Sequence, residues 1–82
     1  MRILLDIDNM YTLIFAIRIA RYHKKNINGL KIITSNEEYV VHISPRFSDD
    51  DFKGLCNDVL ESGYINLTDC ITFIKLSNGE LI

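Results

Sequence analysis

The sequence contains no tryptophan, a single proline and four glycines that stand apart from one another. It therefore has no proline-rich or glycine-rich linker, and isolated glycines cannot form the loop that binds phosphate in nucleotide-binding proteins. Two cysteines are too few for a disulfide framework, so buried free thiols and a reducing, cytoplasmic setting are expected. No stretch of about 18 residues is apolar throughout, because Arg18 and Arg21 interrupt the longest run, so no membrane-spanning helix is expected.

One domain spanning residues 1–82 is predicted, because 82 residues with 48% apolar side chains can form a single small core. The net charge is only −2, but the charges are unevenly distributed. Residues 1–34 hold six basic and two acidic side chains, and residues 35–82 hold three basic and nine acidic ones. This asymmetry indicates either a bipolar surface that binds charged partners or another copy of the chain, or simply two ordinary solvated faces.

The first half of the chain predicts a strand, a helix and a hairpin. Residues 2–7 alternate in polarity, which is typical of a strand with one buried face. Met10–Lys25 is the longest apolar stretch, and we predict a helix there with Asp8 or Asn9 as its N-cap. A strand stays open as the alternative, because this stretch contains several β-branched residues. Two short β-rich runs are predicted to pair as a hairpin: Leu30–Thr34 and Tyr39–Ile43.

A second helix is predicted after the hairpin, with signals at both of its ends. Ser48 is its expected N-cap, and Asp51 three residues later completes a capping box. Phe47 and Phe52 occupy the two positions of a hydrophobic staple, and Gly63 ends the helix. Apolar residues repeat between these ends at helical spacing: Phe52, Leu55, Cys56, Val59 and Leu60.

The last part of the chain completes the predicted topology. Ile71–Leu76 predicts a final long strand, and residues 77–80 (SNGE) predict a hairpin turn before a short stub. The expected order is therefore β-α-β-β-α-β with a short C-terminal hairpin. The fold class is α+β with a ferredoxin-like sheet, because right-handed crossovers place both helices on one face. If Met10–Lys25 were extended instead, the chain would form a meander with one helix packed across it.

Few residues are candidates for catalysis or metal binding. Asp6 and Asp8 at the end of the first strand resemble the start of the haloacid-dehalogenase motif, which has Thr where this chain has Met10. We interpret Asp8 as a helix cap and Asp6 as a solvent-facing strand residue, because the chain offers few elements for the remaining ligands. His23 and His42 also lack metal-ligand spacing to the cysteines. No catalytic residue, metal site or cofactor is therefore predicted.

Charged surfaces are the stronger functional candidates. Seven acidic residues are expected to form one partner-binding patch: Glu37, Glu38, Asp49, Asp50, Asp51, Asp58 and Glu61. Such a patch can occupy a groove that evolved for nucleic-acid phosphates, although the helix dipole alone also explains acidic residues at a helix start. Three cations on the first helix could contact nucleic acid, on one narrow face with Ile14: Arg18, Arg21 and Lys25.

A family resemblance rests on residues 38–44 (EYVVHIS), on the acidic capped helix, and on residues 61–64 (ESGY). Together they resemble the middle of certain small anti-CRISPR proteins and, more broadly, short α+β proteins of phages and mobile elements. The resemblance implies an acidic, non-enzymatic inhibitor, and some members imitate nucleic acid at the binding site of an effector. The basic first helix departs from a uniformly acidic mimic.

Three hypotheses of different classes follow. The first is a non-enzymatic inhibitor in the host cytoplasm that binds a host nucleic-acid-binding protein or effector complex through its acidic surface. The second is a homodimeric ferredoxin-like regulatory module that pairs through a sheet face containing Leu4, Ile74 and Leu76. The third is a weak nucleic-acid binder that uses the basic first helix, although direct binding of nucleic acid is not the leading expectation.

Overall fold

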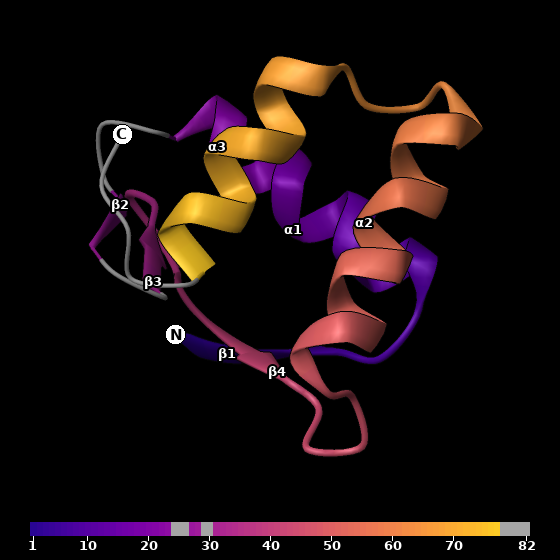
Figure 1. Ribbon diagram of the computed structural model, residues 1–82. Coiled ribbons are helices and arrows are strands. Elements are labelled where there is room, and N and C mark those ends of the chain that lie inside the picture. Colours follow the sequence, from indigo (N-terminus) through magenta and orange to yellow (C-terminus); the bar gives the residue numbers. More distant parts are fainter. Residues whose placement is uncertain (24–26, 29–30, 78–82) are drawn as a thin grey trace.

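The computed structural model describes residues 1–23, 27–28 and 31–77, and it confirms an α+β fold. The elements follow one another as β1 (Arg2–Ile7), α1 (Met10–Tyr22), β2 (Ile27–Asn28), β3 (Lys31–Ile33), β4 (Glu38–Ile43), α2 (Asp49–Ser62) and α3 (Leu67–Ser77). Figure 1 shows the three helices on the same side of β1 and β4. The fold therefore has two layers, a sheet and a group of helices.

The sheet is mixed, and its strand order is β1-β4-β3-β2. β1 runs parallel to β4, with Ile3 opposite Tyr39 and Ile7 opposite Ile43. β3 runs antiparallel to β4, which confirms the predicted hairpin, and the two-residue β2 pairs with the far side of β3. Because side chains alternate along a strand, one face of the sheet is buried under the helices and the other is left open to solvent.

α1 forms because its first turn is fully capped. Asn9 Oδ1 accepts hydrogen bonds from the backbone N–H groups of Tyr11 (2.9 Å) and Thr12 (3.1 Å). The Thr12 hydroxyl accepts a hydrogen bond from the Asn9 backbone N–H in return, at 3.3 Å, which closes a capping box. The helix prediction is confirmed and the strand alternative is wrong, since capping and burial of one face outweigh the β-branched residues. The buried face of α1 consists of Leu13, Ile14, Ala16, Ile17 and Ala20.

α2 matches its prediction closely. Ser48 is the N-cap, its hydroxyl oxygen accepts a hydrogen bond from the Asp51 N–H at 3.2 Å, and Asp51 closes the capping box. Gly63 ends the helix in the left-handed conformation with φ of 77°, which glycine adopts without strain. The buried residues Phe52, Cys56 and Val59 join the common core.

The predicted strand Ile71–Leu76 is wrong, because these residues belong to α3. Asn66 caps this helix, with its Oδ1 atom accepting a hydrogen bond of 2.9 Å from the Asp69 backbone N–H. Cys70 and Phe73 are buried at a spacing of three residues, which suits a helix rather than a strand. The described residues therefore lack the last strand of the predicted ferredoxin-like sheet, and the turn predicted at residues 77–80 falls almost wholly outside them.

This correction also changes the open face of the sheet. Ile74 lies on α3 and packs against the core, so it does not share a sheet face with Leu4. Leu4 is 66% exposed on the face that the helices do not cover. Arg2 and Asp6, its alternate neighbours on β1, are exposed beside it.

Candidate functional site

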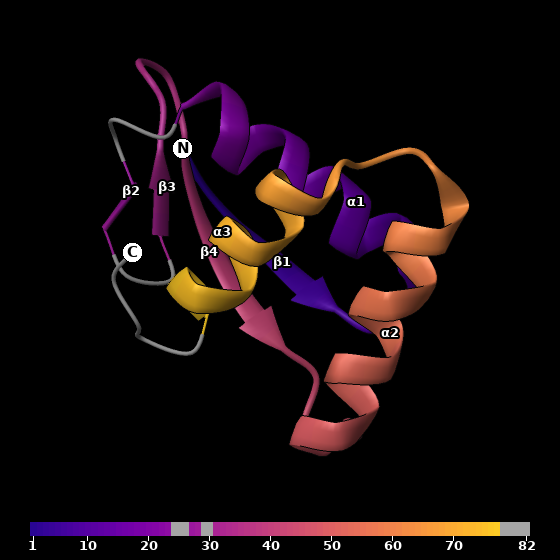
Figure 2. The same cartoon turned by 45° about the horizontal axis from the view of Figure 1, so that its top comes forward.

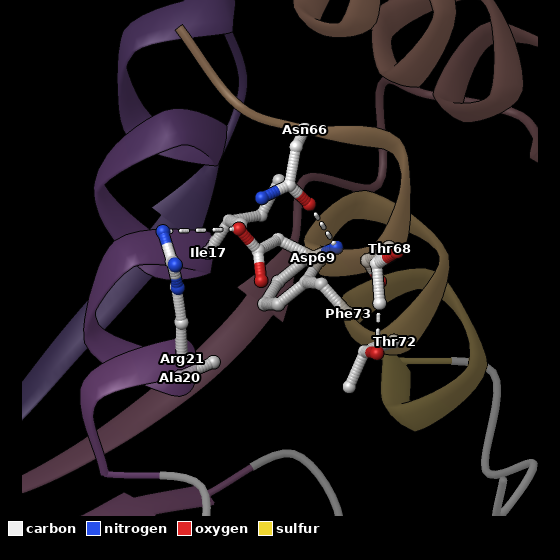
Figure 3. A pocket seen from close by; sticks show the side chains of 8 residues that line it. All are labelled: Ile17, Ala20, Arg21, Asn66, Thr68, Asp69, Thr72 and Phe73. Carbon is white, nitrogen blue, oxygen red and sulfur yellow. Dashed lines mark hydrogen bonds and ion pairs between the residues drawn. The ribbon is translucent and has the colours of Figure 1, made fainter.

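A cavity of about 320 Å³ lies between α1 and α3 (Figure 3). Its apolar floor consists of Ile17, Ala20 and Phe73, which are buried in the core. Arg21 is the one residue of the polar rim that the sequence predicts as a site residue. The others lie just before α3 or within it, and this helix was not predicted. The rim consists of Arg21, Asn66, Thr68, Asp69 and Thr72.

Arg21 and Asp69 form an ion pair at this rim that connects α1 to α3. Arg21 Nη1 lies 3.3 Å from Asp69 Oδ2, and the Asp69 side chain is only 14% exposed. Asp69 Oδ2 has no hydrogen bond within the described residues, so this contact is a charge pairing without an aligned N–H donor. The carboxylate is therefore largely desolvated, and Arg21 compensates its charge.

Two other polar side chains of the rim form hydrogen bonds at the start of α3. Asn66 Oδ1 accepts a hydrogen bond from the Asp69 backbone N–H. The Thr72 hydroxyl donates a hydrogen bond of 2.9 Å to the Thr68 carbonyl. The described lining residues include no histidine or cysteine that could act as a base or nucleophile beside Asp69. These contacts hold the start of α3 together, and the Arg21–Asp69 ion pair joins it to α1.

Cys56 and Cys70 are buried free thiols, as the sequence predicts. Burial, with a smaller contribution from the neighbouring Cys70, raises the pKa of the Cys56 thiol to about 12. Burial also raises the pKa of the Cys70 thiol, whose Sγ atom lies 3.8 Å from the Cys56 carbonyl oxygen. Because the thiolate is the reactive form, neither cysteine is suited to nucleophilic attack or metal binding at neutral pH.

The outward face of α2 brings together most of the predicted acidic residues. At about 100° per residue, Asp50, Gly54, Asn57 and Glu61 form one exposed stripe. Asp51 and Asp58 lie along one side of this stripe, and the exposed Lys53 lies along the other. We call the stripe together with Asp51 and Asp58 the acidic face of α2; Asp49 is exposed at the start of the same helix. Within the described residues, none of the carboxylates of α2 takes part in an ion pair.

Glu37 and Glu38 lie elsewhere. Glu38 is the first residue of β4 and Glu37 directly precedes it, whereas α2 follows the end of that strand, roughly 20 Å away along six strand residues. Figure 2 shows the turn between β3 and β4 at the upper left and α2 at the lower right. Glu38 is paired with Arg2 at 3.6 Å and with Lys31 at 3.3 Å, and Glu37 accepts a hydrogen bond from the Tyr39 hydroxyl. That hydrogen bond, followed by burial, raises the pKa of Tyr39.

Two of the three cations of the predicted basic face, Arg18 and Arg21, lie among the described residues. Arg18 is exposed and Arg21 is engaged with Asp69, while Lys25 lies outside the described residues. Ile14 lies on the same side of the helix as these cations but is only 7% exposed. The reason is that α1 packs against β1, α2 and α3 together, which buries a wider arc of the helix than a sheet alone would.

α1 also carries an exposed aromatic stripe that was not predicted from the sequence. Tyr11, Phe15, Arg18 and Tyr22 follow one another at helical spacing, and all four are exposed. The Phe15 ring meets Tyr39 edge-on with centroids 6.5 Å apart, beside a shallow groove of about 380 Å³. Counting around the helix from Arg18 would have found this stripe, because the same 3.6-residue period that marks a core face also marks an exposed one.

Asp6 and Asp8 each lie beside a side chain that can carry positive charge. Asp6 is exposed and lies 3.0 Å from His42 Nδ1, and Asp8 is 3.5 Å from Arg46. Asn9 rather than Asp8 caps α1. In the part of the chain that the structure describes, no group of three or more His, Cys, Asp or Glu side chains is placed to hold a metal ion.

Comparisons with family models, with curated proteins and with solved structures gave no match to this chain. Among the described residues, no helix is both long enough and apolar enough to cross a membrane. The functional interpretation therefore depends on the chain's own surfaces.

Proposed function

We propose that this chain is a non-enzymatic interaction protein that binds a nucleic-acid-handling partner through the acidic face of α2. The carboxylates of this face can pair with the Lys and Arg side chains with which such a partner holds phosphates. Binding there would inhibit the partner by excluding its nucleic acid, as the resemblance to small anti-CRISPR-type proteins of phages and mobile elements suggests.

Gly54 is the single observation that carries this proposal. Glycine inside a helix costs about 1 kcal/mol relative to alanine. A Cβ atom at Gly54 would meet nothing within 4 Å, and Gly54 does not have a positive φ. No contact or backbone conformation among the described residues therefore requires glycine at this position. Its place in the middle of the acidic face leaves the helix backbone open to close approach by another chain.

A substitution at Gly54 separates binding from folding. The chain is immobilised, and proteins are captured from nuclease-treated lysates of candidate host cells. Gly54→Leu should raise the thermal midpoint, since leucine favours the helix, but should remove the captured partner by filling the contact. Thr68→Leu adds the same side chain at an exposed position of α3 and should leave capture unchanged. Full capture by the Gly54→Leu variant would contradict the proposed function.

The charge of the face is tested separately. A variant with Asp50→Asn, Asp58→Asn and Glu61→Gln keeps the shape of α2 but removes three negative charges. We expect it to bind the captured partner at least about tenfold more weakly, which corresponds to about 1.4 kcal/mol. The control raises the net charge equally at exposed residues outside α2, with Ser35→Lys, Asn36→Lys and Thr68→Lys. Equal weakening in both variants would show that only net charge matters and not this face.

A further inference from the structure

β1 has one open edge. It is the first strand in the sheet order, and no described residue pairs with its other side. The Met1 carbonyl accepts a hydrogen bond from the Glu38 N–H at 2.8 Å, and the Ile7 carbonyl accepts one from the Ser44 N–H at 3.0 Å. The odd-numbered residues therefore bond towards β4, and the backbone N–H and C=O groups of Arg2, Leu4 and Asp6 point to the open edge.

This edge has little of the usual protection against pairing with another chain. Open edges are normally kept very short, interrupted by proline or a bulge, or supplied with charged side chains on the edge or pointing inward. Of these devices β1 has only the exposed charges of Arg2 and Asp6, which are of opposite sign. β1 is six residues long, contains no proline or glycine, and points only Ile3, Leu5 and Ile7 towards the helices. At its centre Leu4 is 66% exposed beside a shallow groove that Arg2 and Val40 also line.

The charge pattern of the edge identifies its partner. Along β1 the solvent-facing side chains read cation, apolar, anion: Arg2, Leu4 and Asp6. In an antiparallel pair of two copies centred on Leu4, the two Leu4 residues lie opposite each other. Each Arg2 then lies opposite the oppositely charged Asp6 of the partner subunit. All three pairs in this register have their N–H and C=O groups directed at each other, so each pair can exchange two backbone hydrogen bonds.

We propose that β1 pairs antiparallel with β1 of a second copy about a two-fold axis at Leu4, which joins the two sheets into one. Arg2 and Asp6 each already form an ion pair within the chain, but both side chains are exposed enough to reach a second copy as well. Arg2 is 3.6 Å from Glu38 with its side chain 66% exposed, and Asp6 is 3.0 Å from His42 with its side chain 51% exposed. Glu38 also keeps Lys31 at 3.3 Å, so it retains a cation if Arg2 turns to the partner subunit.

Light scattering after size exclusion tests the pairing. At tens of micromolar, the wild-type chain of 9.5 kDa should elute with about twice that mass. Arg2→Glu alone and Asp6→Lys alone each place like charges opposite one another, and both variants should be monomeric with unchanged circular dichroism. An equal mixture of the two variants should restore the dimer, because each Glu then faces a Lys. A monomeric wild type, or a mixture that stays monomeric beside a dimeric wild type, would overturn the proposal.

Amide exchange distinguishes edge pairing from stacking of the open sheet faces, which would bring the same charges together. The Leu4 amide has no partner among the described residues, so its exchange should slow at least about tenfold as concentration is raised through the dimer transition. The Ile3 and Leu5 amides already bond to β4 and serve as the reference. Fast exchange at Leu4 in a sample that scatters as a dimer would refute edge pairing.

Discussion

The fold buries two ionisable residues, Cys56 and Cys70, and leaves the Asp69 side chain only 14% exposed. The thiols keep their protons, and the carboxylate is held by a single cation, Arg21. Burial of Cys56 follows from its apolar stripe on α2 and could be predicted from the sequence. The role of Asp69 could not, because it depends on α1 and α3 meeting in space.

The raised pKa values of the two thiols lead us to expect a loss of stability at alkaline pH. The pKa of Cys56 is raised to about 12 in the folded state, above the value of roughly 8.5 for an unfolded thiol. The folded state therefore binds more protons, so this stabilisation is complete below about pH 8 and is lost as pH rises towards 12. Urea unfolding at several pH values should show a slope of at most about 1.4 kcal/mol per pH unit for each thiol.

The control for that measurement is the double variant Cys56→Ala and Cys70→Ala, which has a lower stability but no thiol to titrate. Its free energy of unfolding should fall less between pH 7.5 and pH 9.5 than that of the wild type. An equal fall in both proteins would show that the thiols do not cause the pH dependence.

We expect the Arg21–Asp69 ion pair to contribute a measurable coupling energy to the stability of the fold. Arg21→Met leaves the Asp69 carboxylate without its cation, so the substitution should cost more in the wild type than in an Asp69→Asn background. Because the Arg21 side chain is 66% exposed, solvent screens the pair, and we expect a coupling energy of about 1 kcal/mol or less. A double-mutant cycle by urea unfolding measures it. Strict additivity of the two substitutions would show that the pair contributes nothing.

Among the helices and strands, prediction from sequence succeeded where local signals agreed. Ser48, Asp51 and Gly63 all mark the ends of α2, and the structure has all three in their predicted roles. α3 fails because its β-branched residues favour a strand, whereas the Asn66 cap and the buried pair Cys70 and Phe73 favour a helix. Packing against α1 and α2 decides between these preferences, and the sequence does not contain that contact.

Asn66 provides the test of α3. Asn66→Ala removes the side chain that holds the first turn, so it should lower the free energy of unfolding by about 1 kcal/mol. Asn57→Ala makes the same chemical change inside α2, where an exposed alanine favours the helix, and should cost nothing. Urea midpoints of the two variants give the comparison. If Asn66→Ala were as harmless as Asn57→Ala, Asn66 would not be acting as the helix cap.

At the scale of the whole molecule, the chain has two layers and therefore two sides with different uses. The acidic face of α2 belongs to the helical side, and the open edge of β1 belongs to the sheet. The sequence indicates a charge asymmetry, but it places Glu37 and Glu38 in the same patch as α2. The structure separates them by the length of β4, which no pattern of residue types reveals.

The proposed dimer predicts a thermal midpoint that depends on concentration. Because association stabilises only the folded chain, a tenfold increase in protein concentration should raise the midpoint by roughly 4 °C. Arg2→Glu should unfold at a lower temperature that does not change with concentration. Differential scanning calorimetry over two decades of concentration measures both. A constant wild-type midpoint would argue against self-association.

Competition with duplex DNA tests most directly whether the acidic face of α2 occupies a phosphate-binding groove. The captured partner is loaded with a short labelled duplex, and fluorescence anisotropy follows the release of this duplex as the chain is added. We expect the wild-type chain to displace the duplex, and the Gly54→Leu variant to leave it bound at the same concentration. A ternary complex, in which the partner holds the duplex and the wild-type chain together, would contradict the proposed function.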